Sequence, residues 1–350
     1  MRKYQIYELN KELNHAGSKA PEDVSKISSE MGFEKIIISK SNNKQDIFSK
    51  IKRQIIFSSG WNKAYSQIKP NSIVLLQHPF RDRQINRERI LLKLKKKKAV
   101  KFICVIHDVE KLRGTMFNEY YKNEFDFMLK IADKFIVHNR NMEKYFISLG
   151  VDKNKLINLH IFDYLQSNSK VGKKPIFTKD INIAGNLDAS KSKYLAKLGK
   201  INANFILYGP NFNLKHIDNV KYMGSFPADD IPNKLVKGFG LIWDGNSVDT
   251  CDGATGKYLQ YNNPHKLSLY LSSGLPVIIW KNAAEAQFVS ENNLGLVVKS
   301  LKQASNQLKK ISKKQYDDYS RNVQMISKKL LQGKYLKTAL DEAVSSLENE

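Results

Sequence analysis

The chain of 350 residues contains little cysteine and no long apolar segment. Its two cysteines, Cys104 and Cys251, are too few for a disulfide framework or a cysteine-based zinc site. No apolar run approaches the roughly 20 residues that a membrane-spanning helix needs, and residues 1–13 have no apolar signal core. These absences predict a soluble, cytoplasmic protein of a reducing compartment, without a structural metal.

Acidic residues are also scarce, since 34 Asp and Glu stand against 58 Lys and Arg, a formal net charge of +24. Such a charge attracts nucleic acid, anionic lipid or a phosphorylated ligand. The excess is mostly lysine on polar helix faces, as in residues 92–101 (LKLKKKKAVK), and arginine is not clustered. This pattern favours a solvated surface over a nucleic-acid footprint, and it allows at most a peripheral membrane contact.

Two phosphate-binding motifs are absent. Residues 254–257 (ATGK) do not form a Walker loop, because Cys251 stands where glycine is needed and Tyr258 where serine or threonine is needed. The loop at residues 14–23 lacks the full Gly-x-Gly-x-x-Gly pattern, which argues against dinucleotide binding. No nucleophile elbow of the Ser-His-Asp kind occurs either.

The chain does contain two series of short apolar runs separated by segments of helical period, which predict parallel strands joined by helical crossovers. The first series is IYEL (6–9), KIIIS (35–39), QIIFS (54–58), SIVLLQ (72–77), KFICVIHD (101–108) and KFIVHN (134–139). The second is INIAGN (181–186), FILYG (205–209), VKYMG (220–224), GLIWDG (240–245), PVIIW (276–280) and LGLVV (294–298).

This doubled pattern predicts an α/β protein of two Rossmann-like domains that face a cleft. We expect the domains to span residues 1–162 and 175–311. Residues 312–350 are predicted to be helical, either packing back across the domain junction or forming an oligomer contact.

The most informative segment is residues 252–280 (DGATGKYLQYNNPHKLSLYLSSGLPVIIW). Asn263 suits a helix N-cap and Pro264 the first helical position, which puts Lys266 in the first turn. Backbone N–H groups and the helix dipole favour an anion there, and the lysine adds a full charge. We interpret this as a diphosphate site, with an ordinary capped helix as the alternative. Residues 245–262 are predicted to form a lid-like loop over the ligand.

Other ligand contacts are predicted in loops that follow strands. Gly17 after the first strand, and Gly185 with Asn186 in the second domain, lie where backbone approaches a bound ligand in Rossmann-like folds. Residues 190–192 (SKS) could supply phosphate donors, and Tyr208 could pack on a nucleobase. Simple turn glycines and a buried structural tyrosine are the alternatives.

Candidates for acid or base chemistry come directly off strands of the first domain. His107, Asp108 and Glu110 lie in VIHDVEKLRG, and His78 lies in LLQHPF. A hydroxyl group needs a proton acceptor when it attacks another centre. We predict Asp108 or His107 for that role and place His78 and Glu110 on the acceptor side, although single histidines are commonly structural.

Taken together, HAGSKA, VIHDVEKLR, IAGNL, CDGATGKYLQYNNPHKLSLYLSSGLPVIIW and AQFVSENNLGLVV resemble a known family over nearly the whole chain. The chain is similar to the bacterial glucosyltransferases that add the second sugar to serine-rich-repeat adhesins, onto N-acetylglucosamine (GlcNAc) already linked to Ser or Thr. These are related to a galactofuranosyltransferase-like group. The NNPHK stretch is the most specific part of the resemblance.

The resemblance implies a GT-B fold, a UDP-sugar donor held mainly by the second domain, an acceptor held by the first, and a homo-oligomer, which we expect to be a tetramer. It assigns Gly17 to the donor loop, Tyr208 to the uracil side, and Asn263 with Lys266 to the diphosphate. Ribose recognition stays open, because Glu285 in KNAAEAQFV is out of register with the usual glutamate.

The sequence thus predicts a hexosyltransferase, with glucose as the first candidate sugar and no metal or other cofactor, since no Asp-x-Asp triplet occurs. UDP-GlcNAc and UDP-galactofuranose are alternative donors. A basic nucleic-acid-binding protein and a non-catalytic partner subunit are the alternatives from other classes.

Overall fold

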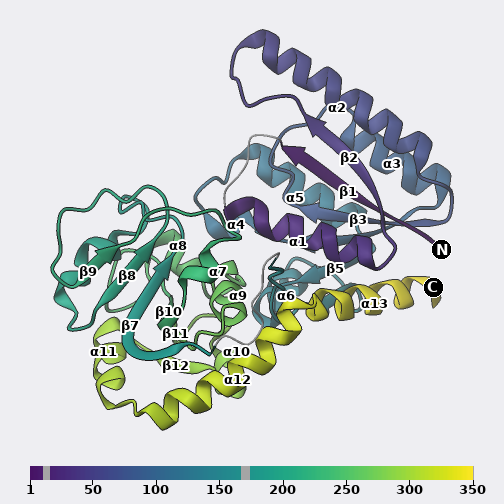
Figure 1. The fold of residues 1–350 in the computed structure, drawn as a ribbon. Coiled ribbons are helices and arrows are strands. Elements are labelled where there is room, and N and C mark those ends of the chain that lie inside the picture. Colours follow the sequence, from purple (N-terminus) through teal and green to yellow (C-terminus); the bar gives the residue numbers. More distant parts are fainter. Residues whose placement is uncertain (11–15, 167–173, 350) are drawn as a thin grey trace.

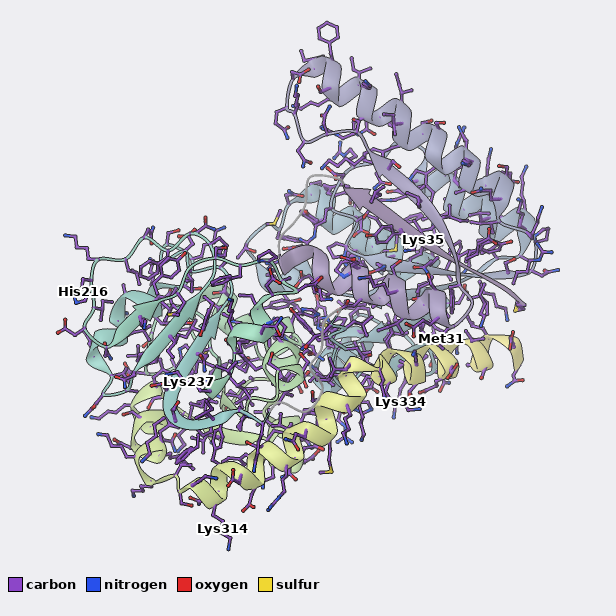
Figure 2. The ribbon with its side chains drawn as sticks, viewed as in Figure 1. Met31, Lys35, His216, Lys237, Lys314 and Lys334 are labelled. Atoms are coloured by element: carbon purple, nitrogen blue, oxygen red, sulfur yellow. The ribbon has the colours of Figure 1, made fainter. Side chains whose placement is uncertain are left out.

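The computed structural model describes residues 1–10, 16–166 and 174–349, apart from the side chains of residues 10 and 16–18. It contains two six-stranded, fully parallel sheets, one in each half of the chain (Figure 1). The predicted α/β architecture of two Rossmann-like domains is confirmed. Lysines such as Lys35, Lys237, Lys314 and Lys334 lie on both domains, as Figure 2 shows, so the charge is not confined to one of them.

The N-terminal sheet has the strand order β2-β1-β3-β4-β5-β6. Its elements are β1 (Arg2–Asn10), α1 (Ala16–Glu30), β2 (Glu34–Lys40), α2 (Ile47–Gln67), β3 (Ser72–His78), α3 (Arg87–Lys98), β4 (Lys101–Ile106), α4 (Glu110–Arg113), α5 (Glu119–Ile131), β5 (Lys134–Val137), α6 (Arg140–Ser148), η1 (Lys153–Lys155) and β6 (Leu156–Asn158). The strand order changes direction between β1 and β3, and such switch points are where α/β sheets bind ligands.

The C-terminal sheet has the order β12-β11-β10-β7-β8-β9, with its switch point between β7 and β10. Its elements are β7 (Ile176–Ala184), η2 (Lys193–Lys200), β8 (Phe205–Tyr208), β9 (Val220–Tyr222), α7 (Ile231–Lys234), β10 (Lys237–Ile242), α8 (Gly253–Tyr258), α9 (His265–Ser272), β11 (Val277–Trp280), α10 (Ala286–Glu291), β12 (Gly295–Val298), α11 (Leu301–Lys310), α12 (Lys313–Leu331) and α13 (Lys334–Asn349).

Two expectations about the N-terminal domain are wrong. Residues 54–58 (QIIFS) lie inside helix α2 and not in a strand. The helix is capped by Asp46, whose side chain accepts from the Ser49 amide, and its period buries Phe57, Trp61 and Ala64 against the sheet. Tertiary burial at helical spacing therefore outweighs the local β-branched run.

Helix α1 begins at Ala16, five residues before the predicted start at Pro21. Gly17 consequently lies in its first turn and not in a free loop. Residues 14 and 15, the start of the predicted ligand loop, lie outside the described residues.

The C-terminal helices join the two domains, as predicted (Figure 1). Helix α12 packs on α9 of the C-terminal domain, and α13 packs on α1, β5 and β6 of the N-terminal domain. Between them Gly333 adopts a φ of +68°, and a Cβ there would lie 2.7 Å from the Ile27 side chain. Leu336, Leu340 and Leu347 of α13 are buried in the N-terminal core. The last helix is thus part of the first domain's core.

Candidate functional site

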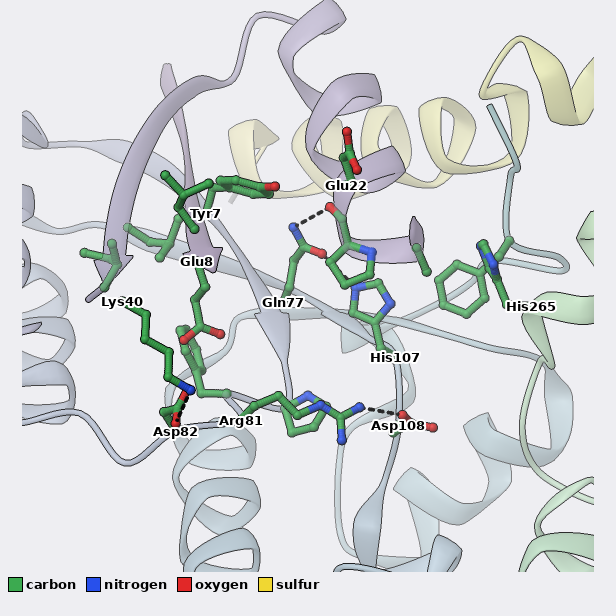
Figure 3. A pocket seen from close by; sticks show the side chains of 18 of the residues that line it. Tyr7, Glu8, Glu22, Lys40, Gln77, Arg81, Asp82, His107, Asp108 and His265 are labelled. Carbon is green, nitrogen blue, oxygen red and sulfur yellow. Dashed lines mark hydrogen bonds and ion pairs between the residues drawn. The ribbon is translucent and has the colours of Figure 1, made fainter. Parts of the chain in front are cut away.

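The main cavity lies at the carboxyl edge of the N-terminal sheet, where the C-terminal domain meets it (Figure 3). It has a volume of about 380 Å³. One wall is formed by residues at the ends of β1, β3 and β4, and the opposite wall by residues 262–265 at the start of α9. This size falls in the range of small-molecule sites.

A cluster of charged side chains follows strands β3 and β4, and three of its members, Arg81, Asp108 and Arg113, line the cavity. Asp108 accepts from Arg81 at 2.9 Å and from Arg113 at 3.1 Å. Glu110, which is 3% exposed, accepts from the same two guanidinium groups at 2.9 and 3.2 Å. Two arginines hold the Asp108 carboxylate in place. Asp108 is therefore suited to positioning the arginines as much as to acting as a base.

Glu8, on β1, is a second carboxylate in the cavity that sequence analysis did not single out. Burial raises its pKa from 4.5 to about 7, despite the charge of Arg87. Its carboxylate accepts a hydrogen bond from Gln84. Beside it Lys40 pairs with Asp82 at 2.8 Å (Figure 3). A carboxylate whose pKa lies near neutrality is suited to accept a proton from a reacting hydroxyl group.

His107 also lines the cavity. Its Nε2 lies 2.7 Å from Gln77 Oε1, and its ring stacks on Phe162 with centroids 5.4 Å apart. Burial, together with the nearby His138 and His265, lowers the pKa of His107 well below its usual value. The imidazole is therefore neutral at physiological pH.

His78 has a different environment. It is 2% exposed, and its Nδ1 lies 2.9 Å from Glu124 Oε2 in the N-terminal core. The Glu124 carboxylate also accepts from the Phe80 amide. The structure thus pairs the His78 imidazole with a buried carboxylate, and His78 is not among the residues that line the main cavity.

The C-terminal wall presents three buried polar atoms that have no hydrogen-bond partner among the described residues: Asn262 Oδ1, Asn263 Oδ1 and His265 Nε2. The orientation of Asn263 is fixed, because its Nδ2 donates to the His160 carbonyl at 3.1 Å. Burial lowers the pKa of His265 to about 4, so the ring is neutral. Buried polar atoms are nearly always paired, so these unpaired atoms indicate a place for a ligand with donor groups.

Helix α9 differs slightly from its predicted start. Pro264 is the N-cap and His265 the first helical residue, and the Asn263 side chain reaches the interdomain segment instead of capping the helix. Lys266 is in the first turn, as expected, and its Nζ donates to the Trp243 carbonyl just beyond β10 at 3.1 Å. The ammonium group therefore lies at the switch point of the C-terminal sheet.

Gly185 and Asn186 follow β7 at the same switch point. Gly185 has a φ of +141°, and a Cβ there would meet no atom within 4 Å. This leaves open space against the backbone, which a ligand can approach. Asn186 Oδ1 accepts from the Asp188 amide and from Asn211 Nδ2, so it organises the loop. Of the predicted phosphate donors at 190–192, Ser192 donates to Asp244 at 2.8 Å.

Tyr208 ends β8 but is only 5% exposed. Its ring packs near Phe226, and its hydroxyl donates to the Lys234 carbonyl at 3.4 Å. Little of the ring is accessible for stacking on a base.

The expected lid, residues 245–262, is instead a docked segment. It contains helix α8, which packs on α4 of the N-terminal domain. Tyr258 at the end of α8 is 3% exposed, and its hydroxyl accepts from the Val109 amide at 2.9 Å. The segment therefore holds the two domains together beside Asp108.

Glu285 forms a second link between the domains. It is 2% exposed and accepts from Asn139 Nδ2, at the start of α6, at 2.8 Å. Burial raises its pKa to about 8. Asn139 Nδ2 also donates to the Tyr261 carbonyl, so one amide joins α6 to two parts of the C-terminal domain.

Within residues 1–10, 16–166 and 174–349, no three His, Cys, Asp or Glu side chains converge as metal ligands would. None of the helices in these ranges is both long and apolar enough to span a bilayer.

Sequence reasoning also missed Arg81 and Arg113, which organise Asp108 and Glu110. Arg81 follows β3 in the HPFR stretch, at the same sheet edge as Asp108, and this position was the available signal. The sequence signal for Glu8 was weaker: it is a carboxylate within a predicted strand.

Comparison with known proteins places the whole chain. The N-terminal domain model of the Glucosyltransferase 3-like family matches residues 3–161, and the C-terminal domain model matches residues 181–343. The chain is 39% identical to the β-1,6-galactofuranosyltransferase WbbI of Escherichia coli (strain K12) over 252 residues, 71% of this chain and 72% of that protein. It is 26% identical to Glucosyltransferase 3 of Streptococcus gordonii over 330 residues, 93% of each.

Solved structures agree on the fold. Sucrose-phosphate synthase from Thermosynechococcus elongatus matches with a TM-score of 0.64 and 11% identity, over 99% of this chain and 100% of that one. The Anabaena protein HepE in complex with UDP and glucose matches with a TM-score of 0.59 and 10% identity, over 98% and 100%. The chain therefore belongs to the Glucosyltransferase 3-like family of glycosyltransferases and has the GT-B fold.

Proposed function

We propose that this glycosyltransferase moves a hexose from a UDP-sugar to a hydroxyl group of a sugar acceptor in the main cavity. The proposal rests mainly on the side-chain atoms of residues 262–265 that can accept a hydrogen bond and have no partner among the described residues. Carboxamide oxygens and a neutral imidazole nitrogen accept hydrogen bonds from hydroxyl groups, and a hexose is rich in these. Residues 262–265 line the same cavity as Arg81, Asp108 and Arg113, and its size suits a sugar.

In this proposal, Lys266 and the backbone around Gly185 bind the diphosphate of the UDP-sugar. The free atom of Asn263 is an acceptor, which suits a hydroxyl group better than a phosphate oxygen. Lys266 is already at the carboxyl edge of β10 and can neutralise the departing UDP without a metal. Residues 1–162 are accordingly the acceptor domain, residues 175–311 the nucleotide-sugar domain, and residues 312–350 the helical connection. Gly17 and Tyr208 stay candidates for contacts with the nucleotide.

For the proton of the attacking hydroxyl we propose Glu8 as the acceptor, with Asp108 and His107 as the earlier candidates. Glu8 has a pKa near 7 and lies in the cavity, whereas Asp108 is held by two arginines. Asp108 and Glu110 then orient Arg81 and Arg113 toward the substrates.

Two donors are the main candidates. Glucose transfer to O-linked GlcNAc on a serine-rich-repeat adhesin follows from the similarity to Glucosyltransferase 3, which extends over 93% of the chain. Galactofuranose transfer is favoured by the higher identity, 39%, to a galactofuranosyltransferase. UDP-GlcNAc is a third candidate donor. A homotetramer, a cytoplasmic location and the absence of nucleic-acid partners complete the proposal.

A donor screen tests it. The protein is incubated with UDP-glucose, UDP-galactofuranose or UDP-GlcNAc, with a GlcNAc-modified Ser/Thr-rich peptide or a free saccharide acceptor, in the presence of a chelator. We expect one donor to add the mass of its own sugar residue to an acceptor, as read by mass spectrometry. Turnover only with added divalent metal would contradict the metal-independent step, and no transfer or hydrolysis with any donor would contradict the function.

A further inference from the structure

Helix α2 exposes a row of large apolar side chains to solvent. Ile47, Phe48, Ile51 and Ile55 are 71%, 84%, 55% and 64% exposed, and their spacing places them along one stripe of the helix. Ile85, from the loop after β3, is 54% exposed and lines the same surface groove as Ile51 and Ile55. We call these five residues the apolar ridge. Contiguous exposed apolar surface of this kind marks a binding surface.

The ridge is held in place by hydrogen bonds and is not a frayed end. Gln54 Nε2 donates to the Arg83 carbonyl at 2.8 Å, and Gln54 Oε1 accepts from the Ile85 amide at 2.9 Å. Asn86 Nδ2 donates to Ser58 Oγ. The opposite face of α2 already fills the core with its own aromatic residues. The helix therefore has two apolar faces, of which one has no partner among the described residues.

The ridge is flanked by exposed basic side chains. Residues 47–81 contain no Asp or Glu. Lys50 and Lys52 are exposed and lie about 100° to either side of Ile51 on the helix, and Arg83 is exposed two residues before Ile85. The acidic residues nearest to the ridge in the sequence are Asp46, the N-cap of α2, Asp82 in the loop after β3, and Glu88 in the first turn of the adjacent helix α3.

We infer that the apolar ridge and its basic surroundings dock this protein on the surface of an anionic lipid bilayer. Apolar side chains insert among the lipid chains while lysines and arginines attract anionic headgroups. Nucleic acid fits less well, because it offers no apolar partner to five exposed isoleucine and phenylalanine side chains. A second copy docked through the same face would bring two basic surfaces together, which is unfavourable.

The apolar ridge lies at the same edge of the N-terminal sheet as the main cavity. Strand β2 ends at Lys40, which lines the main cavity, and α2 begins seven residues later, so the ridge lies at the carboxyl edge of the sheet. The loop that carries Ile85 also carries Arg81 of the charged cluster. Helix α2 is on the outer side of the N-terminal domain, away from the C-terminal domain (Figure 1). A docked molecule would thus hold its acceptor-side cavity close to the headgroups, although docking itself does not depend on the transferase activity.

Flotation of the full chain with unilamellar vesicles tests this inference. We expect binding to phosphatidylcholine vesicles that contain phosphatidylglycerol, weak binding to pure phosphatidylcholine, and weakening by salt. The double variant Phe48→Ser/Ile51→Ser should bind roughly 100-fold more weakly, because each buried apolar side chain contributes about tenfold. Lys50→Gln/Lys52→Gln should lose roughly tenfold or more on anionic vesicles alone.

Met325→Ser is the matched control, since Met325 is 60% exposed on α12 of the other domain, and it should bind as the wild type does. All substituted residues are exposed, and thermal unfolding checks that each variant is folded. Three results would overturn the inference: no binding of the wild type to anionic vesicles, unchanged binding of Phe48→Ser/Ile51→Ser, or a change of oligomeric state in that variant by ultracentrifugation without any vesicle binding.

Discussion

Glu285 offers a test of the domain interface that can be worked out from the structure. Its carboxyl group is 2% exposed, accepts from Asn139 across the interface, and has its pKa raised by burial from 4.5 to about 8. The folded protein therefore holds a proton that the unfolded chain releases at lower pH. Because the folded state binds more protons between pH 4.5 and 8, stability falls as pH rises through this window.

Glu285→Gln keeps an amide oxygen for Asn139 and removes the charge. A pKa difference from 4.5 to about 8 corresponds to about 5 kcal/mol at full ionisation and to about 1 kcal/mol near pH 5. Relative to the wild type, the variant should gain about 4 kcal/mol in free energy of unfolding between about pH 5 and about pH 9. Local loosening of the interface would reduce this gain.

The assay is urea unfolding of both proteins at the two pH values, followed by tryptophan fluorescence. Glu291→Gln, an exposed glutamate of the same helix, provides the baseline for removing a carboxylate. A difference between Glu285→Gln and wild type that does not grow with pH would refute the assignment of a protonated Glu285 at the interface.

Three further predictions follow from the site. Glu8→Gln should reduce kcat roughly 100-fold and remove the rise of kcat/KM with pH near 7, as a pH–rate profile would reveal; an unchanged profile would reject Glu8 as the proton acceptor. Lys266→Ala should lower kcat/KM roughly 100-fold for every donor, and Lys266→Arg should restore part of it, in a coupled UDP-release assay; equal activity of all three would contradict the diphosphate role. Gly209→Ala should cost about 2 kcal/mol or more in thermal unfolding, because its Cβ would lie 1.8 Å from the Gly185 carbonyl oxygen; a wild-type Tm would contradict the close packing of these loops.

The doubled parallel-strand pattern was legible in the sequence because strands buried on both faces leave continuous β-branched runs. Each of the six runs of the C-terminal series overlaps a strand of the second sheet. The prediction of a strand at residues 54–58 (QIIFS) was wrong because α2 is apolar on two faces. Its local composition resembles that of a strand, whereas its burial follows a helical period. The contacts of α2 with the sheet distinguish the helix from a strand, and the local sequence does not.

The candidate site was predictable in part for a related physical reason. The position of Lys266 in the first turn of α9 could be predicted, because the signals that start a helix are local in the sequence. Whether Asn263 caps its helix or reaches His160 depends on the packing of the interdomain segment, which sequence does not carry. The pairing of Asp108 with Arg81 joins residues 27 positions apart and depends on the approach of two loops.

Titration of UDP and of a UDP-hexose into the wild type, Asn262→Ala and Lys266→Ala tests the central claim most directly. If residues 262–265 hold the hexose and Lys266 the diphosphate, Asn262→Ala should weaken UDP-hexose binding roughly tenfold while UDP binding is unchanged, and Lys266→Ala should weaken both. Equal binding of UDP-hexose by wild type and Asn262→Ala, or no binding of UDP by the wild type, would contradict the account.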